Sequence, residues 1–260
     1  MSETAPPKIS IRGLTKSFGA NEVLRGVDLD IGESRSLVII GGSGSGKSVL
    51  LKCILGLIQP DAGEIFIDGV DILKLSEGER VRRTRQIGML FQGAALFDSL
   101  KVWENVAFRL IYGEGKSGGK SHKRAIECLG LVGLSPEIGA LLPSELSGGM
   151  QKRVALARAI AADPSILFFD EPTTGLDPIM ADVINNLIVE QVKALGATAI
   201  SITHDMASAM KIADDVAMIY QGRIIWRGPP EDMAQSGDPF VDQFVNGRAD
   251  GPIKMTLRRH

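Results

Sequence analysis

The chain has 260 residues, 44% of them hydrophobic, which is enough to bury the core of one α/β unit with an inserted subdomain. With 23% charged residues and a formal net charge of -2, it has no overall positive field, which excludes nucleic acid as a partner held by bulk charge. Cys53 and Cys128 have neither a CxxC partner nor a histidine at metal-ligand spacing, so we expect no zinc site or disulfide scaffold, but a protein of the reducing cytoplasm.

The first part of the chain predicts a small antiparallel lobe and one buried strand. Residues 8–18 and 22–31 alternate apolar and polar side chains, as strands with one buried face do, and residues 64–72 resume the pattern. Between these segments, residues 36–40 form a continuous apolar run, which is typical of a strand buried on both faces of a parallel sheet. Residues 48–57 then have helical spacing.

The middle of the chain predicts a helical insertion at about residues 103–162. Helical spacing replaces the strand pattern there and is interrupted by residues 113–123, a Gly/Lys/Ser tract that we interpret as a flexible tip, with residues 118–121 as a solvated loop within it. Residues 118–121 (GGKS) resemble half of a phosphate-binding loop. Because Glu114 stands where the upstream glycine is required, we exclude this segment as a nucleotide site.

The last third predicts the rest of the parallel sheet and a tail. Residues 166–169 and 197–202 are further buried strands, and residues 216–227 alternate as a strand pair. We therefore expect an α/β domain over residues 8–237, with a parallel core sheet, an antiparallel β lobe and a helical subdomain. Residues 238–260 carry apolar side chains that are unusual for a free end, so they contact a dimer partner or other subunit, or pack on their own domain.

One segment has the pattern of a nucleotide-binding loop. Residues 41–48 (GGSGSGKS) match GxxxxGK[ST] and lie between a buried strand and a helix, which is the context that this motif requires. Glycines let successive N–H groups turn toward phosphate oxygens, the lysine adds positive charge, and the last hydroxyl can reach Mg²⁺. The predicted nucleotide-binding residues are Gly41, Gly42, Ser43, Gly44, Ser45, Gly46, Lys47 and Ser48.

Two carboxylates end the apolar run at residues 166–169. Asp170 suits the surroundings of Mg²⁺, and Glu171 can hold a water in line with the terminal phosphate of ATP. Acidic residues are common at strand ends, so this pair indicates a catalytic site only because the same chain also has a phosphate loop. We predict ATP hydrolysis, with Asp170 as a metal residue and Glu171 as a catalytic residue.

A second glycine-rich segment opens the helix before that strand. In residues 146–151 (LSGGMQ), Ser147 is a good N-cap, but Gly148 and Gly149 each weaken the first turn by about 1 kcal/mol relative to alanine. The sequence offers no packing reason for this cost at either glycine. We infer that a phosphate approaches the bare N-terminus of this helix.

These motifs, in this order, resemble the ATP-binding cassette (ABC) family over roughly residues 8–228. LSGGMQ is similar to the family signature, although Met150 stands where the signature has glutamine. The resemblance implies the phosphate-loop ABC cassette fold, with ATP and Mg²⁺ as cofactors. It also implies four more site residues: Phe18 on adenine, Gln92 at Mg²⁺ and the permease contact, Asp177 across a dimer, and His204 at the γ-phosphate.

The resemblance further implies how the protein assembles. In a head-to-tail homodimer, Ser147, Gly148 and Gly149 of one subunit close over ATP held by Lys47 of the other. No run approaches the ~18 apolar residues of a membrane span, and residues 1–7 lack a signal pattern. We therefore expect the chain to be cytoplasmic, on the inner face of the inner membrane, held there by an integral-membrane permease.

Two segments narrow the lineage. Residues 89–97 and 238–252 are similar to the ATPases of Mla/MCE-type systems, which move phospholipid between the inner and outer membranes of Gram-negative bacteria. This implies a periplasmic MCE-type lipid-binding subunit as a further partner. The alternative is another ABC importer, for example of amino acids, because it would share every catalytic residue. An ABC ATPase of DNA repair would need a coiled-coil insertion, and one that acts on ribosomes would carry two cassettes, and this sequence has neither. A phosphate-loop kinase would lack the signature.

Overall fold

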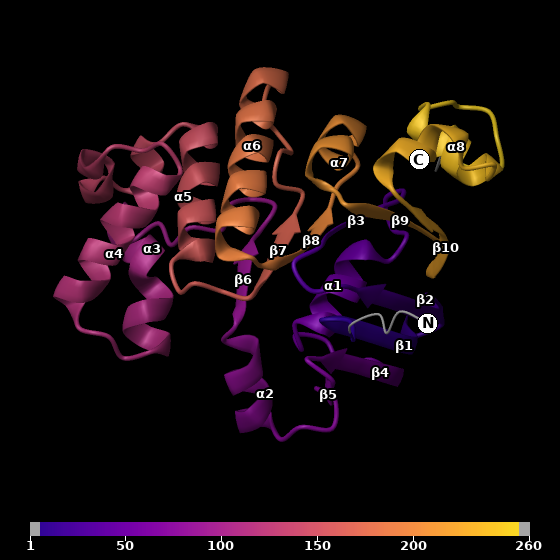
Figure 1. The fold of residues 1–260 in the computed structure, drawn as a ribbon, viewed down its shortest axis with the longest axis horizontal. Helices are drawn as coiled ribbons and strands as arrows, with labels where there is room; N and C mark the ends of the chain where they lie inside the picture. The colour runs from indigo at the N-terminus through magenta and orange to yellow at the C-terminus, as the bar shows by residue number, and fades with distance from the viewer. Residues whose placement is uncertain (1–5, 255–260) are drawn as a thin grey trace.

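Two β-sheets organise the computed structural model, which describes residues 6–254 (Figure 1). The smaller sheet is antiparallel with the order β2-β1-β4-β5, and the larger has the order β10-β9-β3-β8-β7-β6. In the larger sheet the strands from β9 to β6 are parallel, and β10 joins its edge antiparallel. The strands are β1 (Ile9–Phe18), β2 (Asn21–Ile31), β3 (Ser36–Ile40), β4 (Ala62–Ile67), β5 (Val70–Asp71), β6 (Ile87–Leu90), β7 (Ile166–Asp170), β8 (Thr198–Ile202), β9 (Asp215–Tyr220) and β10 (Arg223–Gly228).

Helices lie on both faces of the larger sheet and at its β6 end (Figure 1). The α-helices are α1 (Lys47–Ile54), α2 (Glu77–Thr84), α3 (Val102–Phe108), α4 (Gly118–Leu131), α5 (Gly148–Ile160), α6 (Pro178–Leu195), α7 (Met206–Ile212) and α8 (Pro239–Val245). A π-helical turn spans Arg109–Gly113, and 3-10 turns span Pro136–Ala140, Pro143–Glu145 and Pro230–Gln235. None of the helices in residues 6–254 is both long and apolar enough to cross a membrane.

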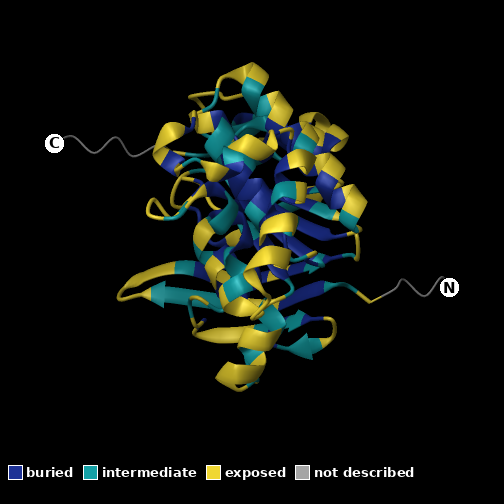
Figure 2. Cartoon of the chain, turned by 90° about the vertical axis from the view of Figure 1, so that its left-hand side faces the viewer, coloured by how far each residue is buried: buried dark blue, intermediate teal, exposed yellow. Residues whose placement is uncertain are grey.

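Alternation along the parallel strands divides the buried residues into two cores. In β3, Leu37 and Ile39 face a core shared with α1 and the antiparallel sheet, and Val38 and Ile40 face a core shared with α3 to α7. Figure 2 shows dark blue, buried strands in the interior, with exposed segments in yellow around them. Since successive side chains point to opposite faces, a strand buried on both sides must be apolar throughout, as the sequence of β3 is.

The structure confirms the predicted fold class and most predicted strands. The run at residues 36–40 is β3, and the pair at residues 216–227 is β9 with β10. The interpretation of residues 118–121 as a solvated loop is wrong, because Gly118 opens α4 and the side chain of Ser121 is fully buried. The predictions also missed β6, which has only 4 residues and includes Gly88, so its apolar run is too short to stand out.

The tail packs on its own domain over its described length. In α8, Val241 is buried in the larger core, and the Phe240 ring lies 4.8 Å from that of Tyr220. Gln243 accepts from Ile253 N at 2.7 Å and donates to the Ile253 carbonyl at 3.1 Å, which folds residues 246–253 back onto the helix. Met255 lies outside the described residues. These contacts favour packing within the chain for residues 239–253.

Candidate functional site

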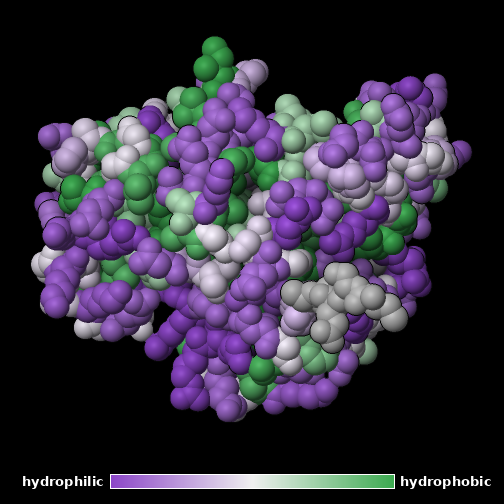
Figure 3. All heavy atoms as spheres, in the orientation of Figure 1, coloured by the Kyte–Doolittle hydropathy of each residue, from purple (hydrophilic) through white to green (hydrophobic). Residues whose placement is uncertain are grey.

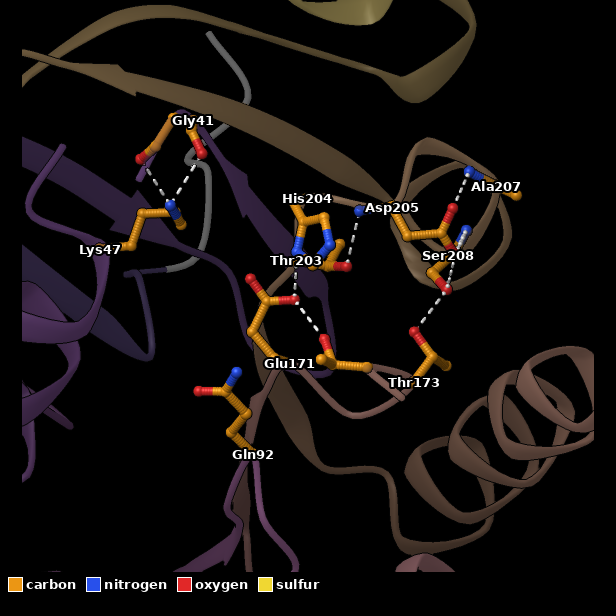
Figure 4. A network of polar contacts seen from close by, with 12 residues as sticks. Gly41, Lys47, Gln92, Glu171, Thr173, Thr203, His204, Asp205, Ala207 and Ser208 are labelled. Carbon is orange, nitrogen blue, oxygen red and sulfur yellow. Dashed lines mark hydrogen bonds and ion pairs between the residues drawn. The ribbon is translucent and has the colours of Figure 1, made fainter. Parts of the chain in front are cut away.

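The predicted catalytic residues meet at one edge of the larger sheet. The glycine-rich loop follows β3, Asp170 ends β7, Glu171 comes next, and His204 follows β8. The carboxyl ends of neighbouring parallel strands lie at the same edge, so β3, β8 and β7 deliver these groups to a common place. Figure 4 shows Lys47, Glu171 and His204 together there, with the Gln92 side chain alongside.

The loop at residues 41–48 has a backbone that requires glycine. A Cβ on Gly41 would lie 2.3 Å from the Ile219 carbonyl oxygen, and Gly46 has a φ of 110° beside the β2 backbone. Gly46 caps α1 without a side-chain hydrogen bond in the described chain, so the first N–H groups of the helix are open to an anion. Lys47 donates to the carbonyls of Gly41 and Gly42 at 2.7 and 2.9 Å, which folds its ammonium group over the loop.

Glu171 is held by three contacts at the end of β7. Its Oε2 atom lies 2.8 Å from Nδ1 of His204 and accepts a 3.0 Å hydrogen bond from the Thr174 hydroxyl. Its N–H donates to the Ile202 carbonyl at 2.9 Å. Its backbone has a φ of 49°, in the left-handed region that non-glycine residues rarely adopt. The carboxylate is therefore fixed in direction while one oxygen, Oε1, keeps its capacity to accept.

Two carboxylates and several lysines near the phosphate loop interact electrostatically. Burial raises the pKa of Asp170, and the charge of Glu171 raises it further, against the opposing charges of Lys52, Lys47 and Lys152. Burial likewise lowers the pKa of Lys47, and the two carboxylates oppose that shift. A half-buried carboxyl pair of this kind is stabilised by an added cation.

The residues at this edge fit Mg²⁺ brought in by a nucleotide. Ser48 presents a hydroxyl, Gln92 an amide oxygen and Asp170 a carboxylate, all oxygen donors suited to a hard cation. No cluster of three or more His, Cys, Asp or Glu suited to a metal occurs in residues 6–254. Mg²⁺ usually binds through one or two carboxylates and the phosphates of its nucleotide, so this donor set fits that mode.

Phe18 lies apart from the catalytic edge, at the tip of the β1–β2 hairpin. Its ring is 50% exposed, with Lys16 Nζ 5.5 Å from the ring centroid, so it is not the core residue that a Phe on an amphipathic strand most often is. The hairpin abuts the phosphate loop, because a Cβ on Gly46 would lie 2.9 Å from Leu24 and 3.0 Å from the Val23 carbonyl. An exposed ring on a hairpin that abuts that loop can stack on a base.

The signature residues do not join the cluster within one chain. Ser147 caps α5 by accepting from Met150 N at 3.3 Å, and α5 packs against β6, beyond β8 and β7 from the phosphate loop. The inference that neither glycine has a packing reason is wrong for Gly149, whose Cβ would lie 2.9 Å from the Met180 side chain. Gly148 has open space around it, so it remains the residue whose lack of a side chain the fold does not explain.

Asp177 also serves the fold, because it caps α6. One carboxylate oxygen accepts from Ile179 N and Met180 N, each at 3.0 Å. The segment before it, residues 173–176, lines a groove of about 500 Å³ together with His204 and the first turns of α6. Ile179 is 80% exposed beside this groove, and Figure 3 shows hydrophobic atoms at the projecting end of α6.

Sequence reasoning missed Lys152, which belongs to α5 and reaches the catalytic edge. Its side chain is nearly buried and Nζ donates to the carbonyls of Gln92 and Glu171, the latter at 3.3 Å. The available signal was its spacing, because Gly149, Lys152 and Leu156 share one helix face and the two neighbours are apolar or small. A lysine on such a face is either solvated at its tip or bound to a buried partner.

Comparison with known proteins gives a consistent result. A family model described as "ABC transporter" matches residues 24–174. The "Probable ribonucleotide transport ATP-binding protein mkl" of Mycobacterium leprae is 40% identical over 95% of this chain and 71% of that protein. The "Intermembrane phospholipid transport system ATP-binding protein MlaF" of Haemophilus influenzae is 40% identical over 95% of this chain and 93% of that protein.

Among solved structures, the fold is similar to a dimeric ATP-binding cassette, MJ0796, in a post-hydrolysis state bound to ADP and Pi. The TM-score is 0.78 at 34% sequence identity, and the match covers 85% of this chain and 98% of that one. The similarity therefore extends over most of this chain and nearly all of the other.

Proposed function

The chain belongs to the ABC transporter family as an ATP-binding and ATP-hydrolysing subunit, and we propose that it powers phospholipid transport between two membranes. One observation carries the choice of cargo. The likeness to the Haemophilus influenzae protein, whose name specifies intermembrane phospholipid transport, extends over nearly the whole length of both chains. ABC cassettes work as dimers with a membrane permease, so the cargo itself passes through a partner.

In the proposed reaction, the residues around Glu171 catalyse the hydrolysis of ATP to ADP and phosphate. The loop at residues 41–48 and the open N-terminus of α1 bind the phosphates, and Lys47 exchanges its two carbonyl contacts for phosphate oxygens. Glu171 accepts a hydrogen bond from the attacking water, since His204 and Thr174 hold its carboxylate in place. His204 is 63% exposed in the free chain, which leaves it open to the γ-phosphate.

Ser48, Gln92 and Asp170 would hold Mg²⁺ in this proposal. The ion would neutralise charge on the phosphate oxygens. It would also relieve the electrostatic conflict between Asp170 and Glu171, because burial and then the charge of Glu171 raise the pKa of Asp170. Phe18 would stack on adenine from the hairpin next to the loop.

The proposed working unit is a head-to-tail homodimer. The signature turn lies across β7 and β8 from the phosphate loop, which supports a site in which a second subunit supplies Ser147, Gly148 and Gly149 to each ATP. The open space at Gly148 and the exposed Ile179 support a face that another chain covers. Asp177 would contact the partner from the N-terminus of α6.

Copurification tests the proposed cargo and partners. The chain, tagged and expressed in its own host, is isolated from detergent-solubilised membranes, and the associated proteins and lipids are identified by mass spectrometry. We expect a permease, an MCE-type lipid-binding protein and bound phospholipid, with the cassette on the cytoplasmic face. In proteoliposomes, the complex should then move labelled phospholipid when it hydrolyses ATP.

A matched control separates cargo from chemistry. The Glu171→Gln complex should contain the same lipid but fail to move it, because the mutation removes hydrolysis and not assembly. A permease that copurifies with a soluble nutrient-binding protein and carries no phospholipid would contradict the proposed cargo. The nutrient-importer alternative would then hold while the ATPase assignment stood.

A further inference from the structure

A buried lysine on the signature helix joins two loops of the ATP site. Lys152 is only 5% exposed, and its ammonium group donates to the backbone carbonyls of Gln92 and Glu171. These carbonyls belong to segments 79 residues apart in sequence (171 minus 92) that follow neighbouring parallel strands, β6 and β7. One side chain therefore binds the loop after each strand to α5.

Burying an ammonium group is costly, so this placement calls for an explanation. Burial lowers the pKa of Lys152, and the charges of Asp170 and Glu171 raise it part of the way back. An apolar residue would fill the same volume without that cost. What an apolar residue lacks is the donor capacity for two carbonyls and the positive charge beside two carboxylates.

The backbone that Lys152 holds is strained at the catalytic position. Glu171 has a φ of 49°, in the left-handed region that is unfavourable for a non-glycine residue. A donor on its carbonyl oxygen fixes the peptide plane that follows, and with it the direction of the carboxylate toward His204.

A second cation on α5 supports the same arrangement. Arg158 donates to the carbonyls of Ala94 and Ala95 at 2.7 and 2.6 Å, and these residues have φ values of 61° and 49°. The loop after β6 is thus held in an unusual left-handed conformation by two positive side chains of one helix. The repetition indicates that α5 sets the position of this loop, beyond filling the core.

We propose that Lys152 is a positioning residue for ATP hydrolysis, which holds Glu171 and the Gln92 loop in register with the signature helix. The inference rests on the proposed role of Glu171. Any shift of α5 when a partner closes on Ser147 would move both loops together, because the same ammonium group binds both. Lys152 does not touch the nucleotide and acts through Glu171.

A double-mutant cycle tests this. Lys152→Met should lower kcat by about tenfold or more with KM for ATP within about threefold, since the phosphate loop is untouched. In a Glu171→Gln background the same change should lower kcat less than about twofold, because the residue acts through a carboxylate already removed. Lys152→Arg, which keeps charge and donors, should recover part of the loss.

Controls keep the outcomes distinct. Lys193→Met removes an exposed lysine from α6 and should leave kcat unchanged. If Lys152→Met does not fold, Lys152→Gln, which keeps an amide NH₂ donor but loses the charge, takes its place in the cycle. Wild-type kcat per folded molecule, or a loss that multiplies fully with Glu171→Gln, would overturn the inference. A Glu171→Gln enzyme of normal activity would instead remove the proposed catalytic role on which it rests.

Discussion

At the scale of single residues, the site is organised around Glu171. Its strained backbone, its 2.8 Å contact with His204 and the hydroxyl of Thr174 fix the carboxylate, while Lys47 lies close enough for the two charges to interact. Because these contacts use Oε2, we expect the carboxylate to accept a hydrogen bond from a water through Oε1 without being displaced. A general base or water-orienting group needs this combination of fixed direction and free acceptor capacity.

Glu171→Gln should therefore lower turnover by about 10²- to 10³-fold, which corresponds to about 3 to 4 kcal/mol of lost transition-state stabilisation. ATP affinity should stay near normal because the phosphate contacts lie in residues 41–48. Steady-state ATPase assays and equilibrium binding of labelled ATP measure the two effects. Hydrolysis at the wild-type rate would show that another group positions the water.

At the scale of elements, the first turn of α5 contains two glycines with different explanations, one required by the fold and one that the fold does not require. Gly149 faces Met180 of α6, so its small size has a packing reason within the chain. A Cβ added to Gly148 would meet no atom within 4 Å, and the φ of Gly148 is not in the positive range, so alanine fits there. Glycine at that position costs helix stability without any gain in the single chain.

Gly148→Ala should raise or preserve the stability of the monomer, by up to about 1 kcal/mol, and yet weaken the ATP-dependent dimer. Gly118→Ala is the matched control, because Gly118 is likewise the first residue of a helix with no atom in contact range. Thermal unfolding and size-exclusion chromatography with ATP, both in the Glu171→Gln background, report the two properties. Equal dimer formation by both variants would contradict a partner phosphate at Gly148.

The same reasoning applies to α8, which the structure packs on its own domain. Val241→Ala should cost about 2 kcal/mol of unfolding free energy, since Val241 is fully buried in the larger core. Val189→Ala on the exposed face of α6 should change stability by less than about 0.5 kcal/mol. Urea denaturation of the monomer compares them. An unchanged midpoint for Val241→Ala would favour the tail as a subunit contact.

At the scale of the whole molecule, the sequence predicts elements that carry a strong local pattern. Buried strands such as β3 are apolar on both faces, and the loop at residues 41–48 has a fixed spacing, so fold class and phosphate site follow from the chain itself. The start of α4 does not, since its glycines and lysine are typical of loops, and the helix is packed by residues that lie mostly further along it, namely Ser121, Ala125, Cys128 and Leu129. Lys152 was missed because its partners are backbone carbonyls, which the sequence does not identify, and its place on an apolar helix face was the one available signal.

The arrangement of the two halves of the ATP site is the central claim. Lys47 and Ser147 belong to one chain but lie on opposite sides of β7 and β8, so the account places them in different subunits of each working site. Lys47→Ala and Ser147→Arg should each abolish ATP hydrolysis. Mixed in equal amounts, they form some dimers in which one site combines the intact Lys47 of one subunit with the intact Ser147 of the other.

The most direct measurement is the ATPase rate of that mixture, with mixed dimers counted by native mass spectrometry. Random pairing makes half of the dimers mixed, each with one intact site of two, so we expect about a quarter of the wild-type rate if the sites act independently. Each variant alone, at the same total concentration, should remain inactive. A mixture as inactive as its components, with mixed dimers present, would contradict the head-to-tail site.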